Sequence, residues 1–241
     1  MFQLLLFLEG LVHMVSLGNR ILAELVDDDE YSFFFRRLIS VPLSFGQILS
    51  APGIPIKHAY FITGGMACVL TSMRNGMTVS DHVIGREGFV GVPLILECDQ
   101  LPVASTVVQV AGNAMRTDIA LFREAFRKPG KLQSLLHRYV LSHLGHLMQV
   151  AACNRLHCIG ERLALLLLMT SDRVGDEFRM THETIAQMLG SRRATVTVEA
   201  ERFQSKGLVR YRYGHITILN HRGLQDAACE CYGVHREDFQ P

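Results

Sequence analysis

The chain has 241 residues, of which 49% are hydrophobic and 20% are charged, and its formal net charge is +1. This composition is typical of a globular protein and excludes an intrinsically disordered one, and the length suits one large or two modest domains. No apolar run approaches the ~20 residues that span a bilayer, so no membrane association is predicted. Six scattered cysteines favour reduced thiols in a cytoplasmic protein, and Cys229-x-Cys231 and Cys153-x4-Cys158 are only weak metal motifs.

The first 18 residues form an apolar extension. The run from residue 2 to residue 17 lacks a basic n-region and is interrupted by Glu9 and His13, which argues against a secretory signal. Two interpretations stay open: an extra helix packed on the protein or its dimer, or an upstream start. The segments NRILAEL, from Asn19, and YSFFFRRLI, from Tyr31, are then predicted to form short helices with apolar faces.

Residues 41–118 are predicted to form short antiparallel strands. Runs of strand-forming residues alternate there with Gly, Pro and Asn, which is typical of a small sandwich or a barrel-like roll. Asn75-Gly76 is the strongest hairpin signal in this region. The expected strands are His58–Ile62, Ala67–Thr71, Met77–Ile84, Ala104–Val110 and Ala114–Thr117.

A long helix is predicted from Lys131 to Ala152, and its apolar residues approximate a heptad stripe. The helix is long enough for a two-stranded coiled coil, so it either joins two chains in a homodimer or packs on its own barrel. A second helix, from Arg155 to Met169, and a loop, from Asp172 to Glu177, are expected to follow. The stripe consists of Leu132, Leu136, Tyr139, Leu144, Leu147 and Ala151.

The most informative stretch begins at Thr181. This residue is predicted to N-cap a helix that Gly190 ends, and Ser191 is predicted to cap a second helix that Gly207 ends. Two short helices joined by a tight turn form a helix-turn-helix. Paired recognition helices need a symmetric spacer to reach major grooves ~34 Å apart, which favours the homodimer interpretation of the long helix.

The second of these helices has two different sides. Val196, Ala200 and Phe203 recur at i, i+4 and i+7 and are expected to bury against the first helix. A helix fits the major groove of B-DNA, where Arg193 can bind guanine and Thr197 can offer a hydroxyl or a methyl group. The side chains expected on the outer side are Arg193, Ala194, Thr197, Glu201 and Gln204.

The sequence LVRYRYGHITIL that follows predicts a β-hairpin with a Gly214-His215 turn of type II′, which would form a wing. From Arg179 to Arg222 there are eight Lys/Arg and three Asp/Glu, a formal charge of +5 in a chain of +1. Concentrated positive charge indicates a polyanion partner. An amphipathic helical hairpin that serves only to pack is the alternative, and this charge argues against it.

Together these features resemble the Crp/Fnr superfamily of bacterial transcription regulators, over about residues 19–232. The resemblance lies in PLSFGQILSAPGIPIKHAYFITGGMACVL, similar to the opening of the family's β-roll, in GREGFVGVPLIL, similar to its phosphate-binding cassette, and in TIAQMLGSRRATVTVEAERFQSKGLV, similar to its helix-turn-helix. It implies a homodimer that binds two-fold symmetric double-stranded DNA and responds to an effector in the roll. RNA polymerase is a further candidate partner.

The fold is accordingly expected to be α+β, and no enzymatic activity is predicted, because the chain has no Gly-rich phosphate loop, no G-x-S-x-G and no H-E-x-x-H. A sensory or protein-interaction module that uses the roll without specific DNA readout is the alternative function. The expected parts are an extension (residues 1–18), a β-roll effector-type domain (19–130), a dimerisation helix (131–153), a winged helix-turn-helix domain (154–232) and a tail (233–241).

The cassette departs from the family members that bind cyclic nucleotides. In those members a Glu holds the ribose 2′-OH and an Arg neutralises the phosphate, whereas Val92 and Val103 stand at these positions here. A buried phosphate without its cation would carry a large desolvation cost, so no cyclic-AMP binding is predicted. The residues predicted for the effector pocket are Gly88, Phe89, Val92, Val103, Ala104 and Ser105.

Other cofactors are weakly indicated. The iron–sulfur cluster of the oxygen-sensing branch is not expected, because no Cys precedes Cys68. His143-x2-His146 with Cys153 would lack a fixed fourth ligand, so no metal site is predicted. A haem or a small-molecule effector stays open. The candidate haem ligands are His58, His82, His143 and His146.

The recognition helix also departs from the best-known members. Arg193 matches their guanine-reading Arg, whereas Ala194 and Val198 replace a Glu and a second Arg, so a different operator is expected. Helix N-termini and basic wing residues are expected to contact phosphates. The predicted DNA contacts are Thr181, His182, Ser191, Arg192, Arg193, Thr195, Thr197, Arg210 and Arg212, with His215 as a further wing candidate.

Overall fold

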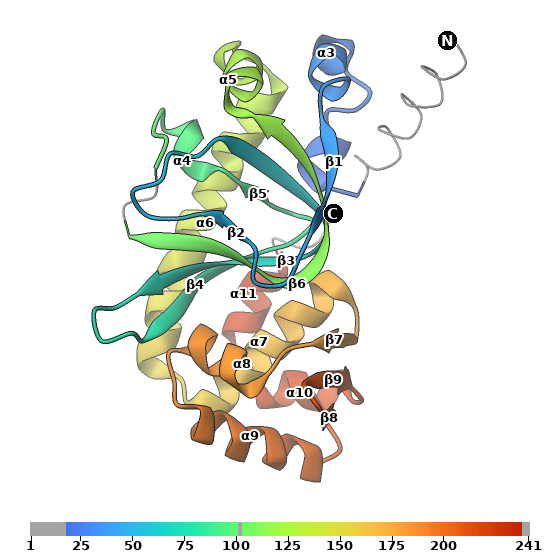
Figure 1. Cartoon of the computed structure of the whole chain (residues 1–241). Helices are drawn as coiled ribbons and strands as arrows, with labels where there is room; N and C mark the ends of the chain where they lie inside the picture. Colours follow the sequence, from blue (N-terminus) through green and yellow to red (C-terminus); the bar gives the residue numbers. More distant parts are fainter. Residues whose placement is uncertain (1–17, 101–102, 238–241) are drawn as a thin grey trace. The chain divides into compact units, whose positions relative to one another are not determined.

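The computed structural model describes residues 18–100 and 103–237, and of residues 235–237 the backbone only (Figure 1). The predictions for residues 1–17 lie outside the described residues. The described residues divide into two compact units, one built from residues 18–67, 84–100 and 103–141 and the other from residues 68–83 and 142–237. The predicted α+β class is confirmed, since helices accompany two antiparallel sheets. None of the described helices is long and apolar enough to cross a membrane.

The N-terminal part of the chain forms a β-roll. Its six-stranded sheet has the order β1-β6-β3-β4, with β2 paired to β6 and β5 paired to β3. The elements are α2 (Arg20–Ala23), a 3-10 turn η1 (Asp29–Tyr31), α3 (Ser32–Phe35), β1 (Ile39–Leu43), β2 (Ile48–Ser50), β3 (His58–Ser72), β4 (Thr78–Ile84), β5 (Phe89–Val90), α4 (Val92–Ile95), β6 (Ala104–Asp118) and α5 (Ile119–Arg127).

Two of these strands are longer than the sequence predicted. β3 and β6 each run for 15 residues, whereas Gly64-Gly65 and Gly112-Asn113 were expected to divide each of them into two strands. These glycines instead allow β3 and β6 to approach each other closely, because a Cβ on Gly112 would lie 2.1 Å from the carbonyl oxygen of Gly64. The Asn75-Gly76 hairpin is confirmed: Gly76 has φ +81°, and Met77 N–H donates to Asn75 Oδ1 at 3.0 Å.

Aromatic and aliphatic side chains fill the core of the roll. Phe89 lies at its centre, with its ring 5.1 Å from that of Phe61 and 5.3 Å from that of Phe122. Asn19 confirms the predicted first helix, because its Oδ1 accepts the Leu22 N–H at 3.2 Å. Its amide nitrogen also donates to the Ile62 and Gly88 carbonyls at 2.9 Å, so this cap fastens α2 to the roll.

The long helix is α6 (Lys131–Leu156), and only part of the predicted apolar stripe is exposed. Leu132 and Leu136 are fully buried in the core of the roll, so the first part of the predicted stripe packs on the chain's own barrel, which is the second interpretation of this helix. The large apolar side chains that α6 exposes between its ends are instead Leu141 (70% exposed), Leu144 and Met148 (72%). These three residues are spaced by three and four positions, as in a coiled-coil seam.

The C-terminal part contains a bundle and a small sheet. α7 packs against α8, α9, α10 and α11, and the sheet has the order β7-β9-β8. The predicted helix from Arg155 is wrong at its start, because Arg155 belongs to α6 and Cys158 caps α7. The elements are α7 (Ile159–Val174), β7 (Glu177–Arg179), α8 (His182–Leu189), α9 (Arg193–Ser205), β8 (Val209–Arg212), β9 (His215–Ile218), α10 (His221–Ala227) and α11 (Cys231–Glu237).

Candidate DNA-binding surface

Two helices meet at the predicted tight turn. Thr181 caps α8 as expected, with its Oγ1 accepting the Thr184 N–H at 3.1 Å. Gly190 ends α8 in the left-handed conformation, at φ +60°, and Ser191 N–H donates back to the Ala186 carbonyl at 2.9 Å. The helix-turn-helix predicted from the sequence is therefore present.

The start of α9 differs by one residue from the prediction. Arg192, not Ser191, occupies the N-cap position, and it makes no side-chain hydrogen bond to the helix. Ser191 cannot cap because its backbone still belongs to the turn that closes α8. The first-turn amides of α9 consequently receive no hydrogen bond from a cap side chain, and exposed Arg192 and Arg193 stand beside them. This arrangement suits an anion.

The two sides of α9 match the prediction, with one exception. Val196, Ala200 and Phe203 are buried. Thr197 is half-buried rather than fully outward, and its hydroxyl donates to the Arg193 carbonyl at 3.0 Å. The exposed residues of the outer side are Arg193, Ala194, Thr195, Val198, Glu201 and Gln204.

His182 connects α8, the helix that supports α9, to α9 itself and to strand β8. Its Nδ1 lies 3.0 Å from Thr197 Oγ1, and its ring centroid lies 4.2 Å from that of Tyr211. Burial, followed by the nearby Arg193 charge, lowers the pKa of His182. Its Nε2 is buried and has no hydrogen-bond partner among the described residues. These contacts fit a neutral imidazole that holds α8 against α9.

The wing has a different turn from the predicted one. The strand register pairs Arg212 with His215, so the turn residues are Tyr213 and Gly214. Both have positive φ, 51° and 78°, which is the pattern of a type I′ turn and not of type II′. The sequence also missed β7, which pairs with β9 where the end of a loop was expected.

The wing exposes basic and aromatic side chains at its tip. Arg210 and Arg212 are both exposed, and the Arg212 guanidinium lies 5.7 Å from the centroid of the Tyr213 ring. Tyr213 is 88% exposed, and sequence reasoning did not single it out. The sequence offered no signal for it, because the turn was predicted one residue later, at Gly214-His215.

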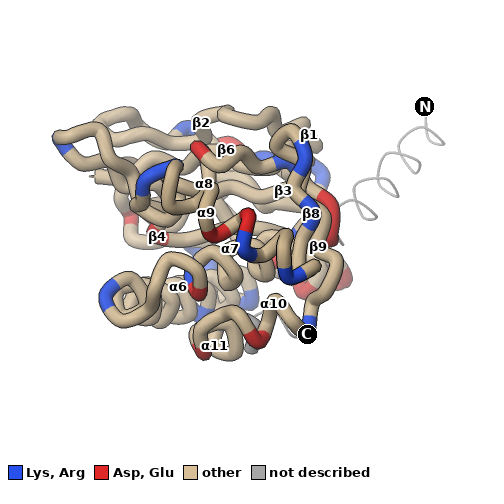
Figure 2. Tube along the Cα trace, turned by 90° about the horizontal axis from the view of Figure 1, so that it is seen from below, with Lys and Arg blue, Asp and Glu red and all other residues tan. Residues whose placement is uncertain are grey.

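Charge is distributed unevenly around α9 (Figure 2). The helix itself carries two Arg and two Glu, so it contributes no net charge to the +5 of residues 179–222. One arginine and one glutamate of the helix, Arg202 and Glu199, form an ion pair at 3.7 Å. The positive excess therefore comes from the segments around the helix, which include the turn before it and the wing after it.

The predicted effector-pocket residues occupy different environments. Phe89 is part of the roll core, and a Cβ on Gly88 would lie 2.5 Å from Ile84 Cγ2. Val103 is 64% exposed. Among the others, Ala104 is buried and Val92 and Ser105 are half-buried.

The structure brings three of the four candidate haem histidines together. The His82 ring centroid lies 4.2 Å from that of His143 and 5.3 Å from that of His146. Burial, and then the neighbouring His146, lowers the pKa of His143 to about 4. The ring of His58 instead lies 6.2 Å from that of Tyr60.

The geometry defines a winged helix-turn-helix protein. Residues 161–227 match the family of Crp-like helix-turn-helix domains. The chain shares its fold with FixK2 from Bradyrhizobium japonicum, with a TM-score of 0.67 at 13% identity over 80% of this chain and 98% of that one. No curated protein matches the chain in sequence.

Two further solved structures have the same fold. TTHA1359, a Crp/Fnr-family transcriptional regulator from Thermus thermophilus, gives a TM-score of 0.63 at 19% identity over 79% of this chain and 98% of that one. The c-di-GMP responsive global regulator CLP from Xanthomonas campestris gives 0.64 at 14% identity over 80% and 99%. The chain therefore has the fold of the Crp/Fnr regulators and a Crp-like helix-turn-helix domain, which confirms the resemblance seen in the sequence.

Proposed function

We propose that the chain is a dimeric, sequence-specific DNA-binding transcription regulator of the Crp/Fnr type. The observation that carries this proposal is the set of exposed groups at the N-terminal end of α9. Arg192, Arg193 and Thr195 are exposed there, at a helix N-terminus whose amides lack a side-chain cap. An α-helix that enters the major groove uses its N-terminal residues for base contacts, and its amides and dipole favour phosphate.

The residues take separate roles in this proposal. Arg193 reads a base edge, since a guanidinium can bond guanine O6 and N7 together. Arg192 and the two wing arginines, Arg210 and Arg212, bind phosphates, with Thr181 and Ser191 beside them. His182 and Thr197 already bond each other at 3.0 Å, so we assign them to positioning α9 rather than to direct contact.

A second copy of the chain is the proposed partner along α6. Leu141, Leu144 and Met148 are exposed at coiled-coil spacing, and Ala151 continues the same series. Apolar side chains exposed in a continuous row mark an interaction site. The homodimer gives the two copies of α9 the two-fold symmetry that the operator would share.

We propose that the roll does not bind cyclic AMP. Val92 and Val103 offer neither a carboxylate for a ribose hydroxyl nor a cation for a phosphate, and Val103 lies exposed. The desolvation cost of the phosphate would then go uncompensated. Calorimetry with the purified protein should detect no binding of cyclic AMP or cyclic GMP at micromolar concentrations, and clear heats of binding there would contradict this.

Selection of bound duplexes from a random DNA pool tests the proposed function. We would compare the wild type, Arg193→Ala and the control Arg127→Ala, an exposed arginine of α5, at two salt concentrations. The expected result is a two-fold symmetric motif that Arg193→Ala relaxes at one position in each half-site and that Arg127→Ala leaves unchanged. Binding that depends on salt but not on sequence would refute the regulator and favour a protein-interaction module.

A further inference from the structure

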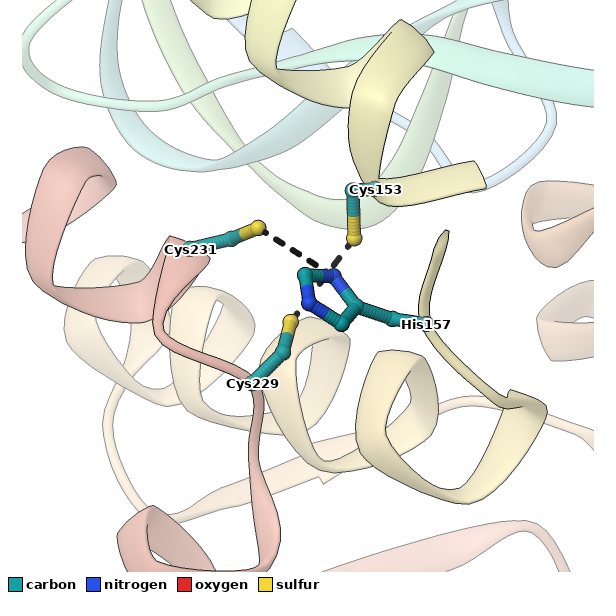
Figure 3. A group of neighbouring side chains, drawn as sticks. All are labelled: Cys153, His157, Cys229 and Cys231. Atoms are coloured by element: carbon teal, nitrogen blue, oxygen red, sulfur yellow. Dashed lines mark hydrogen bonds between the residues drawn. The ribbon is translucent and has the colours of Figure 1, made fainter. Parts of the chain in front are cut away.

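Four side chains from separate parts of the C-terminal unit converge (Figure 3). Cys153 lies in the last turn of α6, and His157 follows that helix. Cys231 is the first residue of α11, and Cys229 lies in the segment between α10 and α11. One ligand atom from each residue, three Sγ atoms and an imidazole nitrogen, all lie within 4.8 Å of one another. Soft thiolate and imidazole ligands select zinc among the divalent ions that cells supply.

The expectation that the chain has no metal site did not consider this cluster. Spacing placed Cys153 in a weak motif with Cys158, but Cys158 is exposed and caps α7, where its N–H donates to Glu161 Oε2 at 2.8 Å. His157, one residue earlier, takes the place beside Cys153. Three cysteines and one histidine are a complete ligand set for a structural zinc site.

Two distances between the ligand atoms match those of a tetrahedral zinc site. Cys153 Sγ and Cys229 Sγ lie 3.7 Å apart, and Cys231 Sγ lies 3.5 Å from His157 Nδ1. Tetrahedral zinc with Zn–S bonds of ~2.3 Å and Zn–N bonds of ~2.0 Å separates two sulfurs by about 3.8 Å and a sulfur and a nitrogen by about 3.5 Å. Both distances therefore suit one tetrahedral ion, and all four ligand atoms lie within 4.8 Å of one another.

Neighbouring polar groups support the ligands in the way that metal sites require. His157 Nε2 lies 3.1 Å from Glu230 Oε2, which leaves Nδ1 directed at the cysteines. A carboxylate on the far nitrogen of a ligating histidine fixes its tautomer and its orientation. Gln149 Nε2 donates to Cys231 Sγ at 3.0 Å. All three cysteines are buried, and His157 is partly buried.

We propose that Cys153, His157, Cys229 and Cys231 bind one zinc(II) ion, which fastens the segment carrying Cys229 and Cys231 to the end of α6. A disulfide between Cys153 and Cys229 is the first rival, but it would leave the orientation of His157 by Glu230 without a purpose. A multi-iron cluster is the second, but its ligands bind different irons and must stand further apart than 4.8 Å allows.

Metal analysis of the untagged, full-length protein tests the proposal directly. Elemental analysis should find close to one zinc per chain, and replacement by cobalt(II) should give the visible absorption of a tetrahedral thiolate site. Cys231→Ser and Cys153→Ser should lose the metal, whereas Cys158→Ser and Cys98→Ser, at exposed cysteines, should retain it. Glu230→Gln should weaken zinc binding about 10-fold to 100-fold in a chelator competition.

Three results would overturn the proposal. The first is that the purified protein contains no zinc and takes up none when zinc is added. The second is that it contains iron and acid-labile sulfide in place of zinc. The third is that protein prepared without oxygen contains a Cys153–Cys229 disulfide. Where a cysteine variant does not fold, the chelator competition on the wild type and on Glu230→Gln still decides the matter. None of these readouts involves DNA, so they are independent of the proposed function.

Discussion

At the start of α9, side-chain and backbone chemistry act in the same direction. A Ser or Asp at the N-cap would satisfy a first-turn amide, but Arg192 occupies this position and makes no such bond. The helix dipole adds roughly half a positive charge at this end, beside two guanidinium groups. Three sources of attraction for an anion thus coincide within two residues, and the helix gives up part of its own stability for them.

The cap of the supporting helix provides a stability test. Thr181→Ala removes the acceptor for the Thr184 N–H and should lower the free energy of unfolding by about 1 kcal/mol. Urea unfolding monitored by circular dichroism would measure the change. Thr195→Ala, at an exposed position inside α9, is the matched control and should change stability by less than about 0.5 kcal/mol. Equal losses for the two variants would contradict the assigned cap.

His143 should make stability depend on pH. Burial lowers its pKa from 6.5 to about 4, with the neighbouring His146 as a second cause, so below pH 6.5 the unfolded chain takes up the proton first. The contribution of neutral His143 to the free energy of unfolding is present in full above pH 6.5. It should be lost as the pH falls towards 4, by up to about 3 kcal/mol. Unfolding experiments at pH 7 and pH 5 would measure it.

A matched pair of variants isolates this effect. His143→Gln should flatten the pH dependence between pH 7 and pH 5, because the titrating group is gone. His137→Gln, at an exposed position on the same helix, should retain the wild-type dependence. If both variants behaved alike, the loss of stability at low pH would come from other groups.

At the scale of elements, sequence patterns predicted what is local. The helix-turn-helix follows from Thr181, Gly190 and the Val196–Phe203 stripe, because caps, stops and helical period are properties of neighbouring residues. β3 and β6 were wrongly divided because a glycine reads as a turn unless the strand opposite is known.

The remaining errors have the same origin. The roll core buries the first turns of α6, so the helical period of the apolar residues alone could not predict which of them are exposed. The Cys/His cluster joins residues more than 70 positions apart, and no spacing rule covers such a distance. Contacts of this kind are set by tertiary structure, so local patterns do not contain them.

The exposed stripe of α6 predicts a test of the dimer. Met148→Glu places like charges opposite each other in a two-fold seam and removes apolar contact, at a cost of several kcal/mol of association. Sedimentation should show monomers at micromolar concentrations where the wild type is dimeric. Met73→Glu is the control, because Met73 is a methionine of similar exposure in the β3–β4 turn, and it should stay dimeric.

At the scale of the whole molecule, charge is segregated along the chain. Residues 179–222 carry +5 in a chain of +1, so the remainder carries a formal −4. In the proposed regulator, such a distribution would attract DNA to one domain and repel it from the rest, which would both steer and orient the encounter. The net charge of the whole chain, +1, does not reveal this segregation of charge.

Salt dependence tests both charge and symmetry. A dimer presents each wing arginine twice, so Arg212→Gln should reduce the slope of log affinity against log salt by about 2, where a monomer would lose about 1. Filter binding between 50 and 200 mM salt, taken as a ~fourfold range suited to this effect, would measure the slope. Arg127→Gln, in the roll, should leave it unchanged, and an equal change there would mean that the wing does not touch the backbone.

Tyr213 has a consequence for laboratory evolution. A tyrosine at φ 51° is less stable there than Asn or Gly would be, and its ring lies 88% exposed at the tip of the wing. A library selected for resistance to proteolysis should therefore drift to Asn or Gly at this position. A library selected for operator binding should retain an aromatic residue only if this exposed ring contacts the DNA. The divergence between the two pools would separate what this residue does for the fold from what it does for the partner.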